Sequence, residues 1–360
     1  MNSSKKVSIT LDSGILGIQK YGGISNYWNR LIENIISNSN FDTNLLLPKK
    51  VINLDFNNLI LNSSSYSTEF INQNLARYLK GNVDPSCNLF HTAYYRLPDN
   101  TQCSYIVTAY DFIYERYGKG LSRWVHSFQK NRALKQADAI ICISDSTRKD
   151  AINFCPSIDP SKFHVVHLAV DHEKFYPDPQ LGDDNLKNTV LWVGQRGGHK
   201  RFDLAVKALN QNNDLKFGIV GSSLTKQETI LLDKFCFNRW SYLGSVNETR
   251  LRQIYSSAFA LIYPSDYEGF GLPILEAMAC GCPVLAANTS SLPEVGGNAA
   301  VYANSQTIDD YSANLKYIQS NRSKLIKLGI DRAQLFNWQK TIQETTAIYL
   351  NTLNSDDLKK

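Results

Sequence analysis

The chain has 360 residues, 43% of them hydrophobic, and 38 basic against 33 acidic residues give a net charge of +5. This length predicts two domains with real cores, and the mild charge argues against a nucleic-acid-binding protein. A slightly basic chain still suits an anionic small molecule or an anionic membrane surface.

No targeting or membrane-spanning segment is expected. Asp12 interrupts the first apolar run, unlike in a signal peptide, and no run reaches the roughly 18 apolar residues that span a bilayer. The seven cysteines lie singly or in apolar runs, without the spacing of a zinc site. We therefore expect reduced, mostly buried thiols in a cytoplasmic protein.

Short β-branched apolar runs predict strands, and segments with helical periodicity lie between them. The predicted strands are 7–11, 104–108, 139–143, 162–167, 189–193, 216–220 and 259–263. The predicted helices are 24–36, 122–136, 202–211, 226–235, 248–257, 274–279 and 338–353. This alternation predicts an α/β protein with parallel sheets and right-handed crossovers.

The alternation is interrupted at residues 175–188, FYPDPQLGDDNLKN. Two prolines, one glycine and three acids in this stretch are typical of a linker. We therefore expect one α/β domain up to about Pro177 and a second from about Asn188 to residue 337, followed by a helix and a short tail. The Asn- and Ser-rich stretch 53–67 is predicted to be a long loop.

Two acidic residues flank a glycine-rich turn in DYEGFGLPILEAMACG, which follows the last predicted strand. The amides of Gly271 and Leu272 would point out of a helix N-terminus, where anions bind well. Glu268 on the loop and Glu276 in the first helical turn would then contact hydroxyl groups around a phosphate. A nucleotide sugar has this form, although both acids could equally serve to complement the helix dipole.

Two further glycine-rich junctions also join a strand to a helix. In WVGQRGGHKRF, residues 192–202, Arg196 and Lys200 lie among glycines and suit a diphosphate, or form an ordinary solvated turn. Near the N-terminus, Gly22 and Gly23 either present amides to an anion or make a plain connection. Three such junctions at strand ends predict one ligand site between two α/β domains.

The sequence resembles the family 4 retaining glycosyltransferases, which have the GT-B fold. The resemblance rests on the two glutamates of YEGFGLPILEAMACGCPV, spaced as E-x7-E, and on blocks that follow in the family's order. These blocks are QKNRALKQADAIICISDSTRKD, KFHVVHLAVDHEKF, VLWVGQRGGHKRFDLAVKAL, YLGSVNETRLRQIYSSAFALIYPS and LPEVGGNAA. LFHTAYYR, VTAYDFIYERY and VGQRGGHK most resemble bacterial-type mannosyltransferases of surface polysaccharide synthesis.

The resemblance implies two Rossmann-like domains facing across a cleft. Residues 1–177 with 338–360 would form the acceptor-side domain, and 188–337 the donor-binding domain, because the last helix would cross back onto the first domain. It also implies catalytic roles for four residues, Glu268, Arg196, Lys200 and Asp111. The donor-binding residues would be Gly22, Gly23, Arg196, Lys200, Leu243, Val246, Glu268, Phe270, Gly271, Leu272 and Glu276.

Each of these residues has an implied partner on the donor. Glu268 and the amides of residues 270–272 would contact the hexose, and Glu276 the ribose. Arg196 and Lys200 would neutralise the diphosphate, and Gly22 and Gly23 would close over it. Leu243 and Val246 would line the base pocket.

One departure from the family concerns a His-Asp pair, which here reads Tyr110-Asp111. Tyr110 would take the histidine's place, or His91 would approach from a neighbouring strand end, both as acceptor-side residues. Acceptor contacts are expected around residues 53–72 and 91–98.

The implied reaction transfers a hexose onto a glycan or lipid-linked acceptor. The favoured hexose is mannose, with GDP-mannose as the donor. It would retain the anomeric configuration by front-face attack, without an enzymic nucleophile, a metal or another cofactor. Three alternatives stay open: a UDP-sugar-dependent enzyme of the same fold, a catalytically inactive nucleotide-sugar-binding protein, and an NAD-dependent dehydrogenase. The dehydrogenase alternative is disfavoured because the sequence lacks the dinucleotide-binding fingerprint.

The basic segment 118–135, which carries Trp124 and Phe128, is interpreted in two ways. It would form peripheral contact with an anionic membrane on the inner face, or it would be an internal helix with a solvated basic side.

Overall fold

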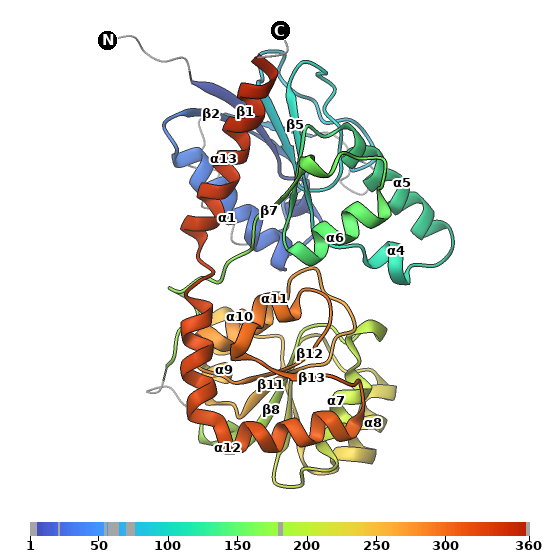
Figure 1. Ribbon diagram of the computed structural model, residues 1–360, viewed down its shortest axis with the longest axis vertical. Coiled ribbons are helices and arrows are strands. Elements are labelled where there is room, and N and C mark those ends of the chain that lie inside the picture. The colour runs from blue at the N-terminus through green and yellow to red at the C-terminus, as the bar shows by residue number, and fades with distance from the viewer. Residues whose placement is uncertain are drawn as a thin grey trace. The chain divides into compact units, whose positions relative to one another are not determined.

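The computed structural model describes residues 6–20, 22–53, 56, 65–69, 76–178 and 183–357. They form two compact units, Met1–His167 with Gln339–Lys360, and Leu168–Trp338 (Figure 1). Both units are parallel α/β folds of the Rossmann-like type, so the predicted fold class is confirmed.

The first unit contains a seven-stranded parallel sheet in the order β3-β2-β1-β4-β5-β6-β7. Its strands are β1 Val7–Asp12, β2 Phe41–Leu47, β3 Ser65–Thr68, β4 Leu89–Thr92, β5 Ser104–Ala109, β6 Ala139–Cys142 and β7 Phe163–Val165. Its helices are α1 Gly23–Ser37, α4 Ile113–Tyr117, α5 Gly120–Gln136 and α6 Asp145–Phe154, with short 3-10 turns at Gly14–Gly17 and Pro160–Lys162. β4, β5 and β6 are buried along their whole length, as expected for inner strands of a parallel sheet covered on both faces.

The second unit contains a six-stranded parallel sheet in the order β10-β9-β8-β11-β12-β13. Its strands are β8 Thr189–Val193, β9 Lys216–Val220, β10 Trp240–Gly244, β11 Ala260–Tyr263, β12 Val284–Ala287 and β13 Val301–Ala303. Its helices are α7 Phe202–Leu209, α8 Lys226–Cys236, α9 Glu248–Ser257, α10 Leu272–Ala279, α11 Leu292–Gly296 and α12 Ile308–Ala333. Short 3-10 turns lie at Asp184–Leu186, Gly198–Lys200 and Gly297–Ala299.

The last helix, α13 Trp338–Asp357, returns to the first unit from residue 339 onward (Figure 1). Tyr349 on α13 is fully buried there, with its ring beside Phe41 and its hydroxyl 2.6 Å from the Nδ1 of His91. The predicted crossing of the C-terminal helix is thus confirmed.

The boundary between the units falls after residue 167, earlier than the expected boundary at about Pro177. The described parts of the proline- and acid-rich stretch are not a free linker, because charged residues in them, and Lys174 just before them, bind α9 of the second unit. These ion pairs are Lys174–Glu248 (2.6 Å), Asp178–Arg252 (3.2 Å) and Asp183–Arg250 (3.1 Å). On both sides of residues 179–182, the second unit therefore holds this stretch through ion pairs.

All seven cysteines are free and buried, which agrees with the expected thiols. Within the described ranges, none of the helices combines the length and apolar character needed to cross a membrane.

Candidate active site

The strand order of the second unit places a topological switch point between β8 and β11. From β8 the chain moves outward through β9 and β10, then returns to the other side of β8 and continues through β11, β12 and β13. Ligands of open α/β sheets bind in the crevice outside the carboxyl ends of the two strands at such a point. The glycine-rich turn after β8 and the loop after β11 are the two stretches on which the sequence places its donor site.

The turn after β8 is open to a ligand. Gly194 ends the strand with φ of +111°, a conformation that favours glycine. A Cβ built on Gly194, Gly197 or Gly198 would meet no atom within 4 Å. The backbone here can therefore be approached closely.

Arg196 leaves this turn with its side chain only 4% exposed. Its Nε donates to the Glu228 carboxylate at 2.8 Å, and its Nη2 donates to the carbonyls of Ser222 and Ser223 at 2.7 and 2.8 Å. Its Nη1 is buried without a hydrogen-bond partner. The guanidinium is thus fixed in place with one donor left over, an arrangement that is costly unless a ligand supplies the acceptor.

Glu228, which orients Arg196, lies in the first turn of α8. It closes a capping box with Thr225, in which the Thr225 hydroxyl accepts from the Glu228 amide and the Glu228 carboxylate accepts from the Thr225 amide. One carboxylate therefore ties the helix start and the Arg196 guanidinium together.

Lys200 and Glu268 meet across the switch point, as the sequence predicts for residues of one site. The Lys200 ammonium donates directly to the Glu268 carboxylate, and it lies 5.6 Å from the ring centre of Tyr263. The Glu268 side chain is 9% exposed and that of Lys200 is 20% exposed. The ion pair is therefore largely shielded from solvent.

The two loops are bonded to each other by their backbones as well. The Asp266 amide donates to the His199 carbonyl at 2.8 Å, and Arg201 pairs with Asp266 at 3.3 Å. A second ion pair thus joins the same two segments beside the pair of Lys200 and Glu268.

A hydroxyl-rich loop after β12, which the sequence analysis missed, holds the Glu268 backbone. Ser290 Oγ accepts from the Glu268 amide at 2.9 Å, and Ser291 Oγ donates to the carbonyls of Glu268 and Phe270 at 3.0 and 2.8 Å. Thr289 donates to the Ser265 carbonyl at 2.8 Å. The sequence signal was the hydroxyl run in NTSSLPE, but its significance depends on β12, which was not predicted.

Helix α10 begins after Gly271, which has φ of +108°. A Cβ at this position would lie 3.0 Å from Leu292, so both the backbone conformation and the space favour glycine. Pro273 is the second residue of this helix, a position where its missing backbone N–H costs no helical hydrogen bond. The start of the helix, which the sequence proposes as an anion site, thus follows a fixed glycine turn.

Glu276 lies on α10 and accepts from the Tyr255 hydroxyl at 3.3 Å. Burial raises the pKa of its carboxyl to about 7, and the negative charge of Glu248 acts in the same direction, against the hydrogen bond from Tyr255. Near neutral pH the Glu276 carboxyl is therefore protonated part of the time. It can donate a hydrogen bond when protonated and only accept one when ionised.

Replacing Glu276 by glutamine should stabilise the second unit above pH 7 and change little near pH 5. The folded wild type keeps the carboxyl protonated up to about pH 7, whereas the unfolded chain ionises near 4.5. Wild-type stability therefore falls as pH rises through this window, by about 1–2 kcal/mol after allowance for partial solvent access. Thermal melting of both proteins at pH 5 and pH 8 checks this, and an equal difference at the two pH values would contradict it.

Leu243 and Val246, the expected base-side residues, are half-buried at and just beyond the carboxyl end of β10. Hydroxyls on either side of Leu243 hold this edge: Tyr242 and Ser245 donate to the Gly221 carbonyl at 2.9 and 3.0 Å. All donor-site residues expected in the second unit therefore lie near the carboxyl ends of β8, β10 and β11.

In the first unit the switch point lies between β1 and β4. Gly22 and Gly23 follow β1 and begin α1, where the Gly22 carbonyl accepts from the Asn26 amide at 3.0 Å and the Ser25 hydroxyl at 2.9 Å. They are thus at a helix N-terminus beyond a strand end, as predicted.

His91 and Tyr110 lie in the core of the first unit, which corrects the expectation that either side chain faces an acceptor. His91 has no exposed surface, bonds Tyr349 and Thr108 through its two ring nitrogens, and has its pKa lowered to about 3 by burial. The Tyr110 hydroxyl accepts from the indole N–H of Trp28. Both side chains are therefore occupied by structural hydrogen bonds.

Asp111, predicted to be catalytic, is half-buried at the end of β5 and accepts from the Ile113 amide at 3.0 Å at the start of α4. Of the loops expected to contact the acceptor, residues 54–55, 57–64 and 70–72 lie outside the described residues, while Ser65–Thr68 forms β3 rather than a loop. The part of the chain that the structure describes contains no cluster of three or more His, Cys, Asp or Glu suited to a metal ion.

Solved structures with the same architecture place the chain in a fold class. Sucrose-phosphate synthase from Thermosynechococcus elongatus matches with a TM-score of 0.78 at 17% identity, covering 97% of this chain and 100% of its own. The Anabaena protein HepE, solved in complex with UDP-glucose, matches with a TM-score of 0.71 at 15% identity, covering 96% and 99%. Two Rossmann-like units in this arrangement of strands define the chain as having the GT-B fold of glycosyltransferases.

Two family descriptions match in tandem, Glycosyltransferase Family 4 over residues 72–174 and Glycosyl transferases group 1 over residues 178–332. The chain therefore belongs to the family 4 type of GT-B glycosyltransferases. A curated relative, O-antigen chain mannosyltransferase B of Escherichia coli, is 42% identical over 111 residues, covering 30% of this chain and 29% of the relative. The alignment with a further curated relative, MMP alpha-(1->4)-mannosyltransferase of Mycolicibacterium hassiacum, spans 56% of that protein's length.

Proposed function

We propose that the chain transfers a hexose from a nucleotide-sugar donor to a glycan or lipid-linked acceptor, with retention of anomeric configuration. The observation that carries this proposal is the pairing of Lys200 with Glu268 at the switch point of the second unit. Lys200 would bind a diphosphate and Glu268 would accept hydrogen bonds from sugar hydroxyls. The two residues lie together at the edge of the sheet where open α/β folds bind their ligands.

In this proposal Arg196 and Lys200 hold the diphosphate. Arg196 brings a fixed guanidinium with an unused N–H, and Lys200 brings an ammonium that can leave Glu268. As the bond between sugar and diphosphate breaks, negative charge grows on the leaving group, and fixed cations stabilise it there. These two residues carry the charge without a metal or other cofactor.

The remaining donor contacts follow from the same placement. Glu268, released by Lys200, accepts from hexose hydroxyls, supported by the backbone amides of residues 270–272. Glu276 accepts from the ribose, and Leu243 and Val246 flank the base. The diphosphate itself takes the acceptor's proton during front-face attack.

The donor we propose is GDP-mannose, supported by the name of the E. coli relative and by the resemblance of VGQRGGHK to mannosyltransferases. The solved structure of HepE with UDP-glucose keeps a UDP-sugar as the alternative. A cytoplasmic location is proposed as well, and seven free, buried thiols support it.

Equilibrium titration with GDP-mannose and UDP-glucose tests the donor. We expect the chain to bind GDP-mannose at least about tenfold more tightly, a difference of about 1.4 kcal/mol. GDP and UDP titrated alone serve as controls, since they separate recognition of the base from recognition of the sugar. Tighter binding of UDP-glucose would overturn the mannose proposal, while tight binding without transfer to any acceptor would favour a binding protein.

A further inference from the structure

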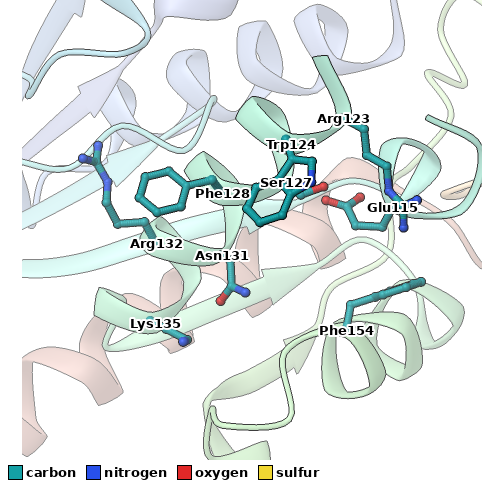
Figure 2. A pocket seen from close by; sticks show the side chains of 9 residues that line it. All are labelled: Glu115, Arg123, Trp124, Ser127, Phe128, Asn131, Arg132, Lys135 and Phe154. Carbon is teal, nitrogen blue, oxygen red and sulfur yellow. The ribbon is translucent and has the colours of Figure 1, made fainter. Parts of the chain in front are cut away.

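Helices α5 and α8 each expose large apolar side chains on one face, but the charges around the two faces differ. On α5, Leu121 is 80% exposed and Phe128 64%, so the interpretation of residues 118–135 as an internal helix is wrong. The cavity beside this face is lined by Glu115, which Lys130 already neutralises, and by the cations Arg123, Arg132 and Lys135 (Figure 2). Two copies of the chain would repel each other there, and membrane contact at this helix stays a prediction.

Helix α8 of the second unit exposes Ile230 and Phe237, which are 67% and 69% exposed. They are seven residues apart, so at about 3.6 residues per turn they differ by only about 20° around the helix axis. Phe237 directly follows the helix with a φ of −47°, a nearly helical value, so its side chain continues the same face. Large apolar side chains that are this exposed on one face indicate an interaction site.

The apolar surface continues from α8 to the edge of the sheet. In the described chain β10 is the outermost strand of its sheet, with a neighbouring strand on one side only. Trp240 and Tyr242 point to the face of the sheet that α8 covers, because the Trp240 indole N–H donates to the Asp233 carboxylate at 2.9 Å. Trp240 is half-buried and Tyr242 is 41% exposed. We call Ile230, Phe237, Trp240 and Tyr242 the α8 strip.

The charges on α8 are arranged for pairing with a second copy. Asp233 and Lys234 are both exposed and lie about 50° to either side of the line through Ile230 and Phe237, so one flank is acidic and the other basic. When two such helices pack side by side in the same direction, the acidic flank of each faces the basic flank of the other. An antiparallel packing would place acid against acid and base against base. Lys226, one turn before Ile230, is long enough to keep its ammonium in solvent.

We propose that two copies of the chain form a dimer through the α8 strip, with the two α8 helices parallel and related by a two-fold axis. Ile230 and Phe237 contact their own counterparts, and Asp233 of each copy pairs with Lys234 of the other. A second copy is favoured over an anionic surface, because the strip is flanked by charges of both signs. The dimer goes beyond the proposed transfer reaction, and it joins two chains through their proposed donor-binding units.

Sedimentation velocity of the full chain over about 1–200 µM tests the proposal. A surface of one helix and one strand edge is small, so we expect a dimer with a dissociation constant of about 1–100 µM. Ile230→Ser with Phe237→Ser should weaken dimerisation at least about tenfold, because the central apolar contacts are lost. The matched control is Leu121→Ser with Phe128→Ser on α5, which removes comparably exposed apolar side chains and should leave dimerisation unchanged.

Charge reversal tests the pairing between the copies. Lys234→Glu should weaken dimerisation at least about fivefold, since it places an acid against Asp233 of the other copy at both contacts. Adding Asp233→Lys restores two pairs of opposite charge, and the dimer should return to within about threefold of wild type. The double variant lacks the hydrogen bond between Asp233 and Trp240, so its recovery comes from the charges between copies. High salt should reduce both effects.

Ile230→Cys tests the direction of packing. In a parallel dimer the two introduced thiols lie opposite each other, within reach of a disulfide, and oxidised glutathione should crosslink the variant into dimers. In an antiparallel dimer each introduced thiol would face Phe237, so crosslinking would need a mixture with the Phe237→Cys variant. Wild type is the control, because its seven thiols are all buried.

The proposal falls if the wild type stays monomeric over the whole concentration range, if the α5 control dissociates as much as the α8 variant, or if Asp233→Lys fails to rescue Lys234→Glu. Crosslinking in the mixture alone would overturn the parallel arrangement. Thermal melting of each variant at about 1 µM, where the monomer predominates, checks its fold. Donor titration and transfer assays are independent of these results, so a failure of the dimer and a failure of the proposed function can be told apart.

Discussion

Replacing Glu268 by glutamine is expected to lower turnover by about 100-fold or more while donor binding changes much less. Glutamine keeps the shape of the side chain and an acceptor oxygen, but it removes the negative charge that, under the proposed function, stabilises developing positive charge on the sugar. The Glu268 backbone is held independently by Ser290 and Ser291, so the loop should keep its position. Steady-state kinetics and direct donor titration measure the two effects.

The neighbouring pair of Arg201 and Asp266 provides a matched control. It joins the same two segments and also consists of one acid and one cation, but nothing places it against the donor. Asp266→Asn should therefore keep turnover within about twofold, as for other exposed ion pairs. A Glu268→Gln enzyme as fast as wild type, or a control as slow as it, would reject the role of Glu268.

Replacing Arg196 by alanine is expected to weaken binding of a nucleoside diphosphate about 10- to 100-fold and binding of the free nucleoside hardly at all. A charged hydrogen bond to phosphate contributes about 1.5–3 kcal/mol, and the nucleoside lacks that phosphate. The variant should also melt at a lower temperature, because the carbonyls of Ser222 and Ser223 and the carboxylate of Glu228 lose their donor. Titration calorimetry at a temperature where the variant is folded gives the comparison.

Arg201→Gln is the control for this experiment, since Arg201 lies on the same turn and is 33% exposed. Removing its charge should lower nucleotide affinity only slightly. If Arg196→Ala lost affinity for nucleoside and nucleoside diphosphate equally, its effect would be general damage to the unit and the diphosphate contact would be disproved.

Much of the fold was predictable because its signals are local. The strands Thr189–Val193 and Lys216–Val220 were predicted with their observed bounds, since short β-branched apolar runs differ clearly from their surroundings. Strand β12, Val284–Ala287, and β13, Val301–Ala303, were missed because they are short and rich in alanine. The 26-residue helix α12 was missed as well, since its apolar face is diluted by polar residues.

The candidate site was predictable where a motif sets the chemistry and less so where packing does. The meeting of Lys200 and Glu268 follows from their places after strands that the sheet brings side by side. The burial of His91 could not be predicted, because it depends on Tyr349, which is distant in the chain. Sequence indicates which polar side chains are available, whereas tertiary contacts decide which of them are already satisfied.

The ion pair of Lys200 and Glu268 has a consequence for discrimination between whole and partial ligands. Each residue is the other's counterion, so a ligand that binds either of them must compete with its partner. Inorganic phosphate or pyrophosphate can replace Glu268 at Lys200, but it leaves a mostly buried carboxylate unpaired beside a new anion, which is unfavourable. A complete nucleotide sugar offers phosphate to the lysine and hydroxyls to the glutamate in one step. We therefore expect phosphate and pyrophosphate to bind the proposed donor site much more weakly than a complete nucleotide sugar does.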